Sequence, residues 1–184
     1  MSDASLSRNT RRALLLAAGG ALGVAFWRRH DLAARLFNPF SADRFDLPPL
    51  PGLLDAEGAP VQGFSAQDLT GRAVFLNAFA SWCPQCRAEH AALLEFAHSG
   101  AIIYGVASLD DPARTLEFLR REGNPFARVG VDRNGYLYRA LGARGVPASF
   151  VMAPAPHLAL KLEGPLDVAL MRAQIQPLLD QDKA

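Results

Sequence analysis

Cysteine is scarce in this chain. Cys83 and Cys86 are the only two among 184 residues, which excludes a framework of structural disulfides. An excess of one charge is also missing, because the formal net charge is +1 and no basic stripe occurs outside the N-terminal residues. This balance argues against a nucleic-acid-binding protein. Half of the residues are hydrophobic, which is enough for the core of one domain with additional segments.

An apolar run of full membrane-spanning length is missing too. Residues 13–27 are uncharged and mostly apolar, but as a helix they would span roughly 22 Å, against about 30 Å of hydrocarbon core. Arginines flank the run on both sides, which disfavours a buried core helix. Residues 1–30 are therefore predicted to be a membrane signal anchor or a cleaved export signal. Both interpretations place the rest of the chain outside the cytoplasm.

Prolines dominate the next segment. Residues 31–52 include Pro39 and the run Leu47-Pro-Pro-Leu-Pro-Gly52, which favours an extended spacer over packed structure. Residues 53–184 are then predicted to form the folded domain. Its first part gives mixed signals, with Ser65 to Leu69 as one helical turn.

The domain is organised around one stretch. Apolar residues fill almost every position from Ala73 to Ala80, which predicts a strand buried on both faces. Pro84 suits a first helical turn, and Ala88, Ala92 and Phe96 recur at helical spacing, so a helix is expected to about His98.

Cys83 is thus predicted to lie where this strand ends and the helix begins. Unpaired N–H groups and the positive end of the helix dipole favour a thiolate there, and we expect Cys83 to be exposed. Cys86 follows one turn deeper, within reach of the Cys83 sulfur. The pair is predicted to open and close as a redox dithiol.

The remaining segments alternate between strands and helices. Acidic residues before Pro112 and a glycine at position 123 mark the start and end of one helix. The pattern predicts an α/β fold, with a parallel core closed by an antiparallel hairpin and helices flanking the mixed sheet. The predicted strands are Ala101–Ala107, Ala127–Val131, Ala148–Met152 and Leu158–Leu162, and the later helices are Tyr136–Leu141 and Val168–Leu179.

A Trp-Cys-x-x-Cys motif at a strand-to-helix junction resembles the thioredoxin superfamily. Val146-Pro147 lies directly before a strand, where that superfamily has a cis-proline that packs against the dithiol. Over about Phe45 to Leu179 the chain is similar to the membrane-anchored thiol:disulfide interchange proteins of cytochrome c maturation, the CcmG/DsbE family. The matching stretches are Leu76-Asn-Ala-Phe-Ala-Ser-Trp-Cys-Pro-Gln-Cys-Arg-Ala-Glu-His90, Gly123-Asn-Pro-Phe126, Gly145-Val-Pro147 and Asp46-Leu-Pro-Pro-Leu50.

Three positions bear on the resemblance. Asn77 stands where thioredoxins carry a buried, proton-handling aspartate, as it does in the cytochrome c maturation group. That group often has an acidic residue after its cis-proline, whereas this chain has Ala148, and its usual Asp-Gly hairpin turn is replaced by Ala153-Pro-Ala-Pro-His157. These departures leave the redox chemistry intact but weaken inferences about the partner.

The resemblance implies a thioredoxin-like thiol:disulfide oxidoreductase. Cys83 attacks a substrate disulfide, and Cys86 resolves the mixed disulfide that forms. Trp82 is expected either to shield the pair and offer a flat apolar surface or simply to pack in the core. Val146 and Pro147 are expected to bind the substrate chain in an extended form. Glu89 is read either as a proton acceptor in the resolving step or as a solvated helix residue.

The site is expected to be reducing, because Gln85 between the cysteines carries no charge that would stabilise a thiolate strongly. The resemblance implies apocytochrome c or its maturation proteins as partners. It also implies a membrane thiol transporter as electron donor, because surroundings outside the cytoplasm keep thiols oxidised. The expected location is the bacterial inner membrane with the domain in the periplasm, or the periplasm alone after cleavage. No cofactor is expected.

The same residues also bear on other function classes. Cys83, Cys86, His90 and His98 fit no common zinc spacing, and no metal site is expected. Covalent haem attachment requires Cys-x-x-Cys-His, but position 87 is arginine. The alternatives that stay open are a TlpA-like reductant for copper-site assembly of cytochrome oxidase and a noncatalytic chaperone that holds apocytochrome near Trp82 and Pro147.

Overall fold

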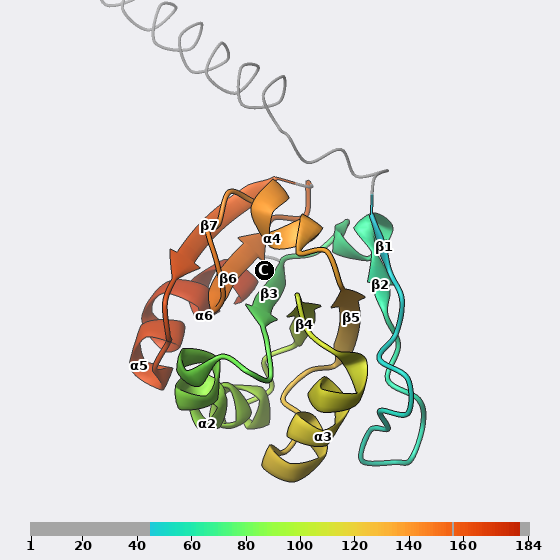
Figure 1. Ribbon diagram of the computed structural model, residues 1–184. Coiled ribbons are helices and arrows are strands. Elements are labelled where there is room, and N and C mark those ends of the chain that lie inside the picture. The colour runs from blue at the N-terminus through green and yellow to red at the C-terminus, as the bar shows by residue number, and fades with distance from the viewer. Residues whose placement is uncertain (1–44, 156, 181–184) are drawn as a thin grey trace, which may run out of the picture. The chain divides into compact units, whose positions relative to one another are not determined.

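The computed structural model describes residues 45–155 and 157–180 (Figure 1). The expected signal or anchor segment and the first part of the expected spacer lie outside these residues. Among the helices that are described, none has the length and apolar character needed to span a membrane.

Five strands form one mixed sheet in the order β5-β4-β3-β6-β7. Strand β3 (Val74–Phe79) lies in the centre and is parallel to β4 (Ile103–Ser108), which is parallel to β5 (Arg128–Asp132). Strands β6 (Ala148–Met152) and β7 (Leu158–Glu163) run antiparallel as a hairpin. The predicted parallel core with a closing hairpin is confirmed. Because β6 runs against β3, its first residues lie at the edge where β3, β4 and β5 end.

Helices and turns cover both faces of this sheet (Figure 1). One face packs against α2 (Pro84–His98), α3 (Pro112–Glu122) and the C-terminal helical segment, with Phe79, Phe96 and Phe118 in that layer. The other face packs against α4 (Tyr136–Ala140) and the 3₁₀ turn Ala66–Leu69. Every residue of β3 is buried, as expected for a central strand covered on both sides.

The last part of the expected spacer is folded into the domain, which corrects the prediction for residues 45–52. Strand β1 (Asp46–Leu47) pairs with β2 (Phe64–Ser65), and Pro49 forms a bridge to Gly130, which lies within β5. Phe45, Leu47 and Leu50 are buried. The prolines occur in an extended edge segment, where a missing N–H is tolerated, and the apolar side chains between them supply the packing.

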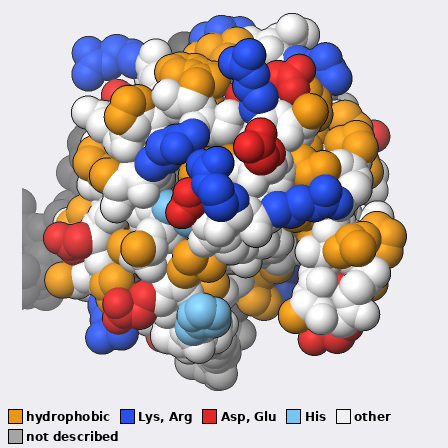
Figure 2. Space-filling view, turned by 60° about the horizontal axis from the view of Figure 1, so that its bottom comes forward, with side chains coloured by type: hydrophobic (Ala, Val, Ile, Leu, Met, Phe, Trp, Pro, Cys, Tyr) orange, Lys and Arg blue, Asp and Glu red, His pale blue; other side chains and the backbone are white. Residues whose placement is uncertain are grey.

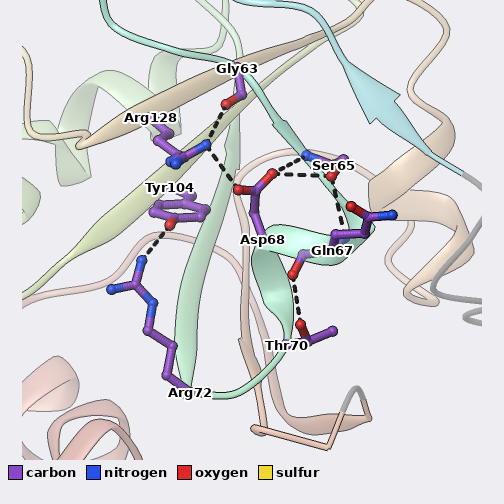
Figure 3. Close-up of polar contacts among 8 residues, drawn as sticks. All are labelled: Gly63, Ser65, Gln67, Asp68, Thr70, Arg72, Tyr104 and Arg128. Carbon is purple, nitrogen blue, oxygen red and sulfur yellow. Dashed lines mark hydrogen bonds and ion pairs between the residues drawn. The ribbon is translucent and has the colours of Figure 1, made fainter.

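A cluster of polar side chains links the 3₁₀ turn Ala66–Leu69 to the sheet (Figure 3). Ser65 and Asp68 cap the 3₁₀ turn reciprocally, and Asp68 also pairs with Arg128 at 3.1 Å. Arg128 donates to the carbonyl of Gly63, and Arg72 donates to the hydroxyl of the buried Tyr104 at 2.6 Å. The backbone N–H of Ser65 is the main reason that the pKa of Asp68 is lowered, with Arg128 as a further cause.

The predicted C-terminal helix is present but irregular. It consists of α5 (Val168–Leu170), a π-helical stretch Met171–Ile175 and α6 (Gln176–Asp180). The π turn lies directly before Pro177. Proline has no N–H and its ring clashes with the preceding turn, so a wider turn accommodates it within a continuous helical segment.

The α2–α3 side of the domain carries charges of both signs. Figure 2 shows basic and acidic side chains interspersed with hydrophobic ones over this face. On α3, Arg121 forms ion pairs with Glu117 and Glu122. No single-sign field dominates this surface.

Candidate active site

The dithiol lies where β3 leads into α2, as predicted. Cys83 is the N-cap of α2, with extended backbone angles, and its sulfur accepts a hydrogen bond from the N–H of Cys86 at 3.2 Å. Pro84 occupies the first helical turn, where its missing N–H leaves no bond unmade. Both cysteines are unbonded thiols in this structure.

Cys83 is less open than expected. Only 4% of its surface is accessible, so the prediction of an exposed thiol is wrong. Its thiol donates to the carbonyl of Val146 at 3.6 Å, across from the start of β6. The backbone at the start of β6 therefore lies against the Cys83 sulfur.

Cys86 lies deeper, at 2% exposure. Burial is the largest cause that raises the pKa of its thiol, and the nearby Cys83 sulfur and the charge of Glu89 act in the same direction. Cys86 is therefore a protonated thiol near neutral pH. The two sulfurs differ in environment, although three residues separate them.

Glu89 is buried to 1% exposure, which rules out the solvated-helix interpretation. Burial raises its pKa to about 7, although two hydrogen bonds to the carboxylate act against this shift. The side-chain amide of Asn77 donates to Oε1 at 2.9 Å, and the backbone N–H of Leu166 donates to Oε2 at 2.9 Å. A buried carboxyl group that titrates near neutrality is suited to proton transfer.

Asn77 joins Glu89 to β6. Its Nδ2 donates both to Glu89 and to the hydroxyl of Ser149 at 3.1 Å, and its Oδ1 is buried without a hydrogen-bond partner. This oxygen is the only such atom found among the described residues. Buried side-chain acceptors without a partner are rare in folded proteins.

The buried face of α2 agrees with the prediction at Phe96 and in part at Ala92, but Ala88 is exposed. The residues of α2 that face the interior are Cys86, Glu89, His90, Leu93 and Phe96. These residues recur at three- and four-residue spacing, which is the periodicity of one helical face. Glu89 and His90 are polar, so the sequence pattern did not indicate that they belong to the buried face.

The substrate-contact residues predicted from the sequence gather at the same edge. Trp82 is 54% exposed, which excludes plain core packing, and its Nε1 donates to the carbonyl of Leu109 at 3.0 Å. The peptide bond between Val146 and Pro147 is cis, as expected, with Val146 half-buried and Pro147 buried.

Sequence reasoning missed Asp110. Its carboxylate accepts hydrogen bonds from the backbone N–H and the hydroxyl of Ser81, at 2.6 and 3.1 Å, and from the hydroxyl of Thr115. Asp111, its neighbour, is the actual N-cap of α3. Two consecutive acidic residues before Pro112 were the available signal, because one helix start needs only one cap.

The residues considered for a metal do not form a site. His90 bonds through Nε2 to the carbonyl of Gly123 at 2.9 Å, and burial lowers its pKa. His98 is exposed at the far end of α2. Within the described part of the chain, no group of three or more His, Cys, Asp or Glu side chains could hold a metal ion.

Known proteins are similar to this chain in sequence. The Redoxin family model matches residues 49–159. The thiol:disulfide interchange protein DsbE of Pseudomonas aeruginosa is 32% identical over 149 residues, which cover 81% of this chain and 78% of that protein. The thiol:disulfide interchange protein HelX of Rhodobacter capsulatus is 33% identical over 126 residues, covering 68% and 72%.

Solved structures agree in fold. A DsbE-type thiol:disulfide interchange protein from Chlorobium tepidum superposes with a TM-score of 0.58 at 24% identity, covering 73% of this chain and 92% of that one. A secreted disulfide oxidoreductase of Mycobacterium tuberculosis gives 0.57 at 18% identity, covering 76% and 97%. With the dithiol at the start of α2 and relatives of this identity and coverage, the chain belongs to the Redoxin family and, within it, to the DsbE-type thiol:disulfide interchange proteins, as a thiol:disulfide oxidoreductase with a thioredoxin-like fold.

Proposed function

We propose that this protein is a membrane-anchored periplasmic reductase that acts on disulfides of apocytochrome c or of cytochrome c maturation proteins. The observation that carries the chemistry is the Cys83 sulfur at the helix start, 3.6 Å from the Val146 carbonyl. The substrate class rests on the resemblance of the motif and its flanking residues to the cytochrome c maturation group. Residues 1–30 would supply the anchor.

Cys83 is the attacking sulfur in this scheme. As a thiolate it releases its hydrogen bond to Val146, and it still accepts the N–H of Cys86 at 3.2 Å, which stabilises the negative charge. Attack on the substrate disulfide forms a mixed disulfide and releases one substrate thiolate, which takes a proton from water.

Cys86 then resolves the mixed disulfide. Its thiol passes a proton to the Glu89 carboxylate while its sulfur bonds to the Cys83 sulfur, and the second substrate sulfur leaves. Cys86 and Glu89 lie three residues apart on the buried face of α2, and the Glu89 charge affects the Cys86 thiol. A proton acceptor with a pKa of about 7 suits a step that operates near neutral pH.

Asn77 gives the proton transfer a partner on β3. When Glu89 is charged, the Asn77 amide donates to it. When Glu89 is protonated, its carboxyl O–H becomes a donor, and the Asn77 Oδ1, which has no hydrogen-bond partner in this structure, is the acceptor that this side chain can offer.

The substrate chain would bind across the start of β6. The carbonyl of Val146 becomes free when Cys83 ionises, and it can then accept a backbone N–H from an extended peptide. The cis bond to Pro147 follows this carbonyl, and the exposed ring of Trp82 would offer the substrate an apolar surface next to Cys83 in the sequence.

The direction of electron flow follows from the residues between the cysteines. Gln85 is exposed and carries no charge that would favour the reduced form strongly, so the dithiol is a reductant rather than a strong oxidant. Two electrons and two protons must return after each turnover, and a membrane thiol transporter is the proposed source.

Trapping tests this function. In a Cys86→Ala variant the mixed disulfide through Cys83 cannot be resolved, so the purified variant should accumulate an adduct with an oxidised apocytochrome c carrying a Cys-x-x-Cys-His segment. Mass spectrometry of the adduct identifies the sulfur that is bonded. Cys83→Ser is the matched control and should form none.

Two outcomes would replace the proposal. Preferential capture of an oxidised copper-assembly protein over apocytochrome c would favour the TlpA-like function. Retention of apocytochrome binding and of cytochrome assembly by Cys83→Ser would favour a noncatalytic chaperone.

A further inference from the structure

Three exposed hydrophobic side chains follow the ends of three neighbouring strands. Trp82, Leu109 and Tyr136 are 54%, 44% and 47% exposed, and they come after β3, β4 and β5 respectively. These strands are parallel and adjacent in the order β5-β4-β3, so their ends share one edge of the sheet. The three side chains, which we call the apolar row, therefore lead along that edge to Cys83.

Hydrogen bonds hold the members of the apolar row in place. The indole of Trp82 donates to the carbonyl of Leu109 at 3.0 Å, and the N–H of Leu109 donates to the carbonyl of Asp132 at 3.1 Å. The carboxylate of Asp132 accepts the N–H of Tyr136 at 2.8 Å. A β-carbon at Gly135 would lie 3.0 Å from Leu109 Cγ, so the leucine side chain lies directly over the residue before Tyr136.

Leu109 is unusual in a second way. Its φ is +53°, and it is the only non-glycine residue with a positive φ in the described part of the chain. This conformation costs a leucine roughly 1–2 kcal/mol, and a glycine or asparagine would adopt it more easily. A strained backbone that carries a half-exposed hydrophobic side chain brings little to the stability of the fold. Such positions are typical of functional sites.

We propose that the apolar row binds a bulky hydrophobic side chain next to the oxidised cysteine of a polypeptide substrate, with Leu109 as the specificity-determining residue. This inference rests on the proposed function. A disulfide must reach Cys83, so the polypeptide that carries it is the molecule brought against the apolar row. Val146 would bind the substrate backbone on one side of Cys83, and the apolar row would bind the adjoining side chain on the other.

Paired substrates test the proposal. Two disulfide-bonded peptides that differ in one residue beside the cysteine, phenylalanine or glutamine, are reduced by the full-length reduced protein, and kcat/KM is measured for each. The wild type should prefer the phenylalanine peptide by about tenfold, and Leu109→Asn should lower this ratio by about fivefold, because the apolar contact area is lost. Asparagine accepts a positive φ, so the variant should unfold at the same or a higher urea concentration.

Leu54→Asn is the matched control, since Leu54 is also a half-exposed leucine but precedes β2. It should retain the wild-type ratio. Equal kcat/KM values of the wild type on the two peptides would show that the apolar row does not select the hydrophobic side chain. An equal loss of preference in Leu54→Asn would show the same. Either result would leave the proposed function standing. Failure of the wild type to reduce either peptide would refute the proposed function itself. A wild-type dimer that Leu109→Asn dissociates would assign the apolar row to a second copy of the chain instead.

Discussion

Helices α2 and α3 start in nearly the same way and do different things. Each follows a buried parallel strand, each has an N-cap residue with extended backbone angles, and each has a proline in its first turn. In α3 the Asp111 carboxylate accepts the N–H groups of Ala113 and Arg114. In α2 the Cys83 sulfur accepts the N–H of Cys86.

The two N-caps differ in the atom that accepts the backbone N–H, which is a sulfur in α2 and an oxygen in α3. An oxygen at this position only stabilises a helix, by about 1 kcal/mol. A sulfur at the same position receives the same N–H and the same helix dipole, but it can also form a covalent bond with another sulfur. The N-cap of α3 thus has a structural role alone, whereas the N-cap of α2 also has the chemical role of a thiolate.

The largest expected effect comes from replacing the sulfur cap by an oxygen cap. Cys83→Ser retains an N-cap acceptor, so its free energy of unfolding should stay within about 1 kcal/mol of wild type. Disulfide reduction should nevertheless be abolished. Asp111→Ser is the reciprocal control and should retain activity. Urea unfolding measures the stability of the two variants, and a peptide-disulfide reduction assay measures their activity. Residual disulfide reduction by Cys83→Ser would contradict the chemical role assigned to the sulfur.

Glu89→Gln should give the next largest effect. Loss of the proton acceptor should slow resolution of the mixed disulfide by about a hundredfold at pH 7, while formation of the mixed disulfide is spared. Stopped-flow kinetics with a labelled disulfide peptide separate the two steps. An unchanged rate of resolution would remove Glu89 from the mechanism.

The same substitution has a signature in stability. The pKa of Glu89 is raised from 4.5 to about 7, so the folded state binds more protons than the unfolded state between these values. Glu89 therefore makes its full contribution to the free energy of unfolding of the wild type below pH 4.5. This contribution falls as the pH rises to about 7. Glu89→Gln should lack this decline and gain up to about 3 kcal/mol over wild type by pH 8. If the free energy of unfolding fell equally with pH in the wild type and in Glu89→Gln, the decline would not come from Glu89, and the raised pKa of its carboxyl group would be contradicted.

A smaller effect should follow from the hydrogen bonds by which Asp110, before α3, binds Ser81, before α2. Asp110→Ala removes the acceptor for the backbone and hydroxyl of Ser81, which should cost about 1–3 kcal/mol and slow the attack by Cys83 severalfold. Asp111→Ala, one residue along, should cost about 1 kcal/mol through loss of the α3 cap and leave the rate of attack unchanged. Equal rates in the two variants would show that Asp110 does not position the dithiol.

The smallest effect concerns a third capped turn, far from the sulfur chemistry. Asp68→Asn should cost about 1 kcal/mol near neutral pH, because Asp68 completes the capping box with Ser65 and pairs with Arg128. The pKa of Asp68 is lowered, so its contribution is present above the unfolded pKa and is lost as the pH falls through the folded value. Urea midpoints of wild type and variant should converge in acid, with activity unaffected.

Much of the sheet could be predicted because its signals are local. Strand β6 has the predicted bounds, and the centre of β3 lies within the predicted apolar run. Proline marked the starts of α2 and α3, and Gly123 marked the end of α3, because the backbone restrictions of these residues act within a single turn.

The site was only partly predictable because its environment depends on residues distant in sequence. Cys83 is hydrogen-bonded to Val146, and Glu89 is hydrogen-bonded to Asn77 and Leu166. Charged residues are rarely buried, so a glutamate on a helix favoured the solvated interpretation. Its spacing from Cys86 was the signal that placed both on one face. The conformation of Leu109 had no counterpart in the sequence pattern.

The central claim is that position makes two chemically identical thiols different. Alkylation of the reduced protein with limiting iodoacetamide at pH 7, followed by peptide mass spectrometry, measures this difference directly, because the thiolate is the reactive form. The account predicts that label accumulates on Cys83 while Cys86, whose thiol has a raised pKa, stays unmodified. Preferential labelling of Cys86, or equal labelling of both, would contradict it.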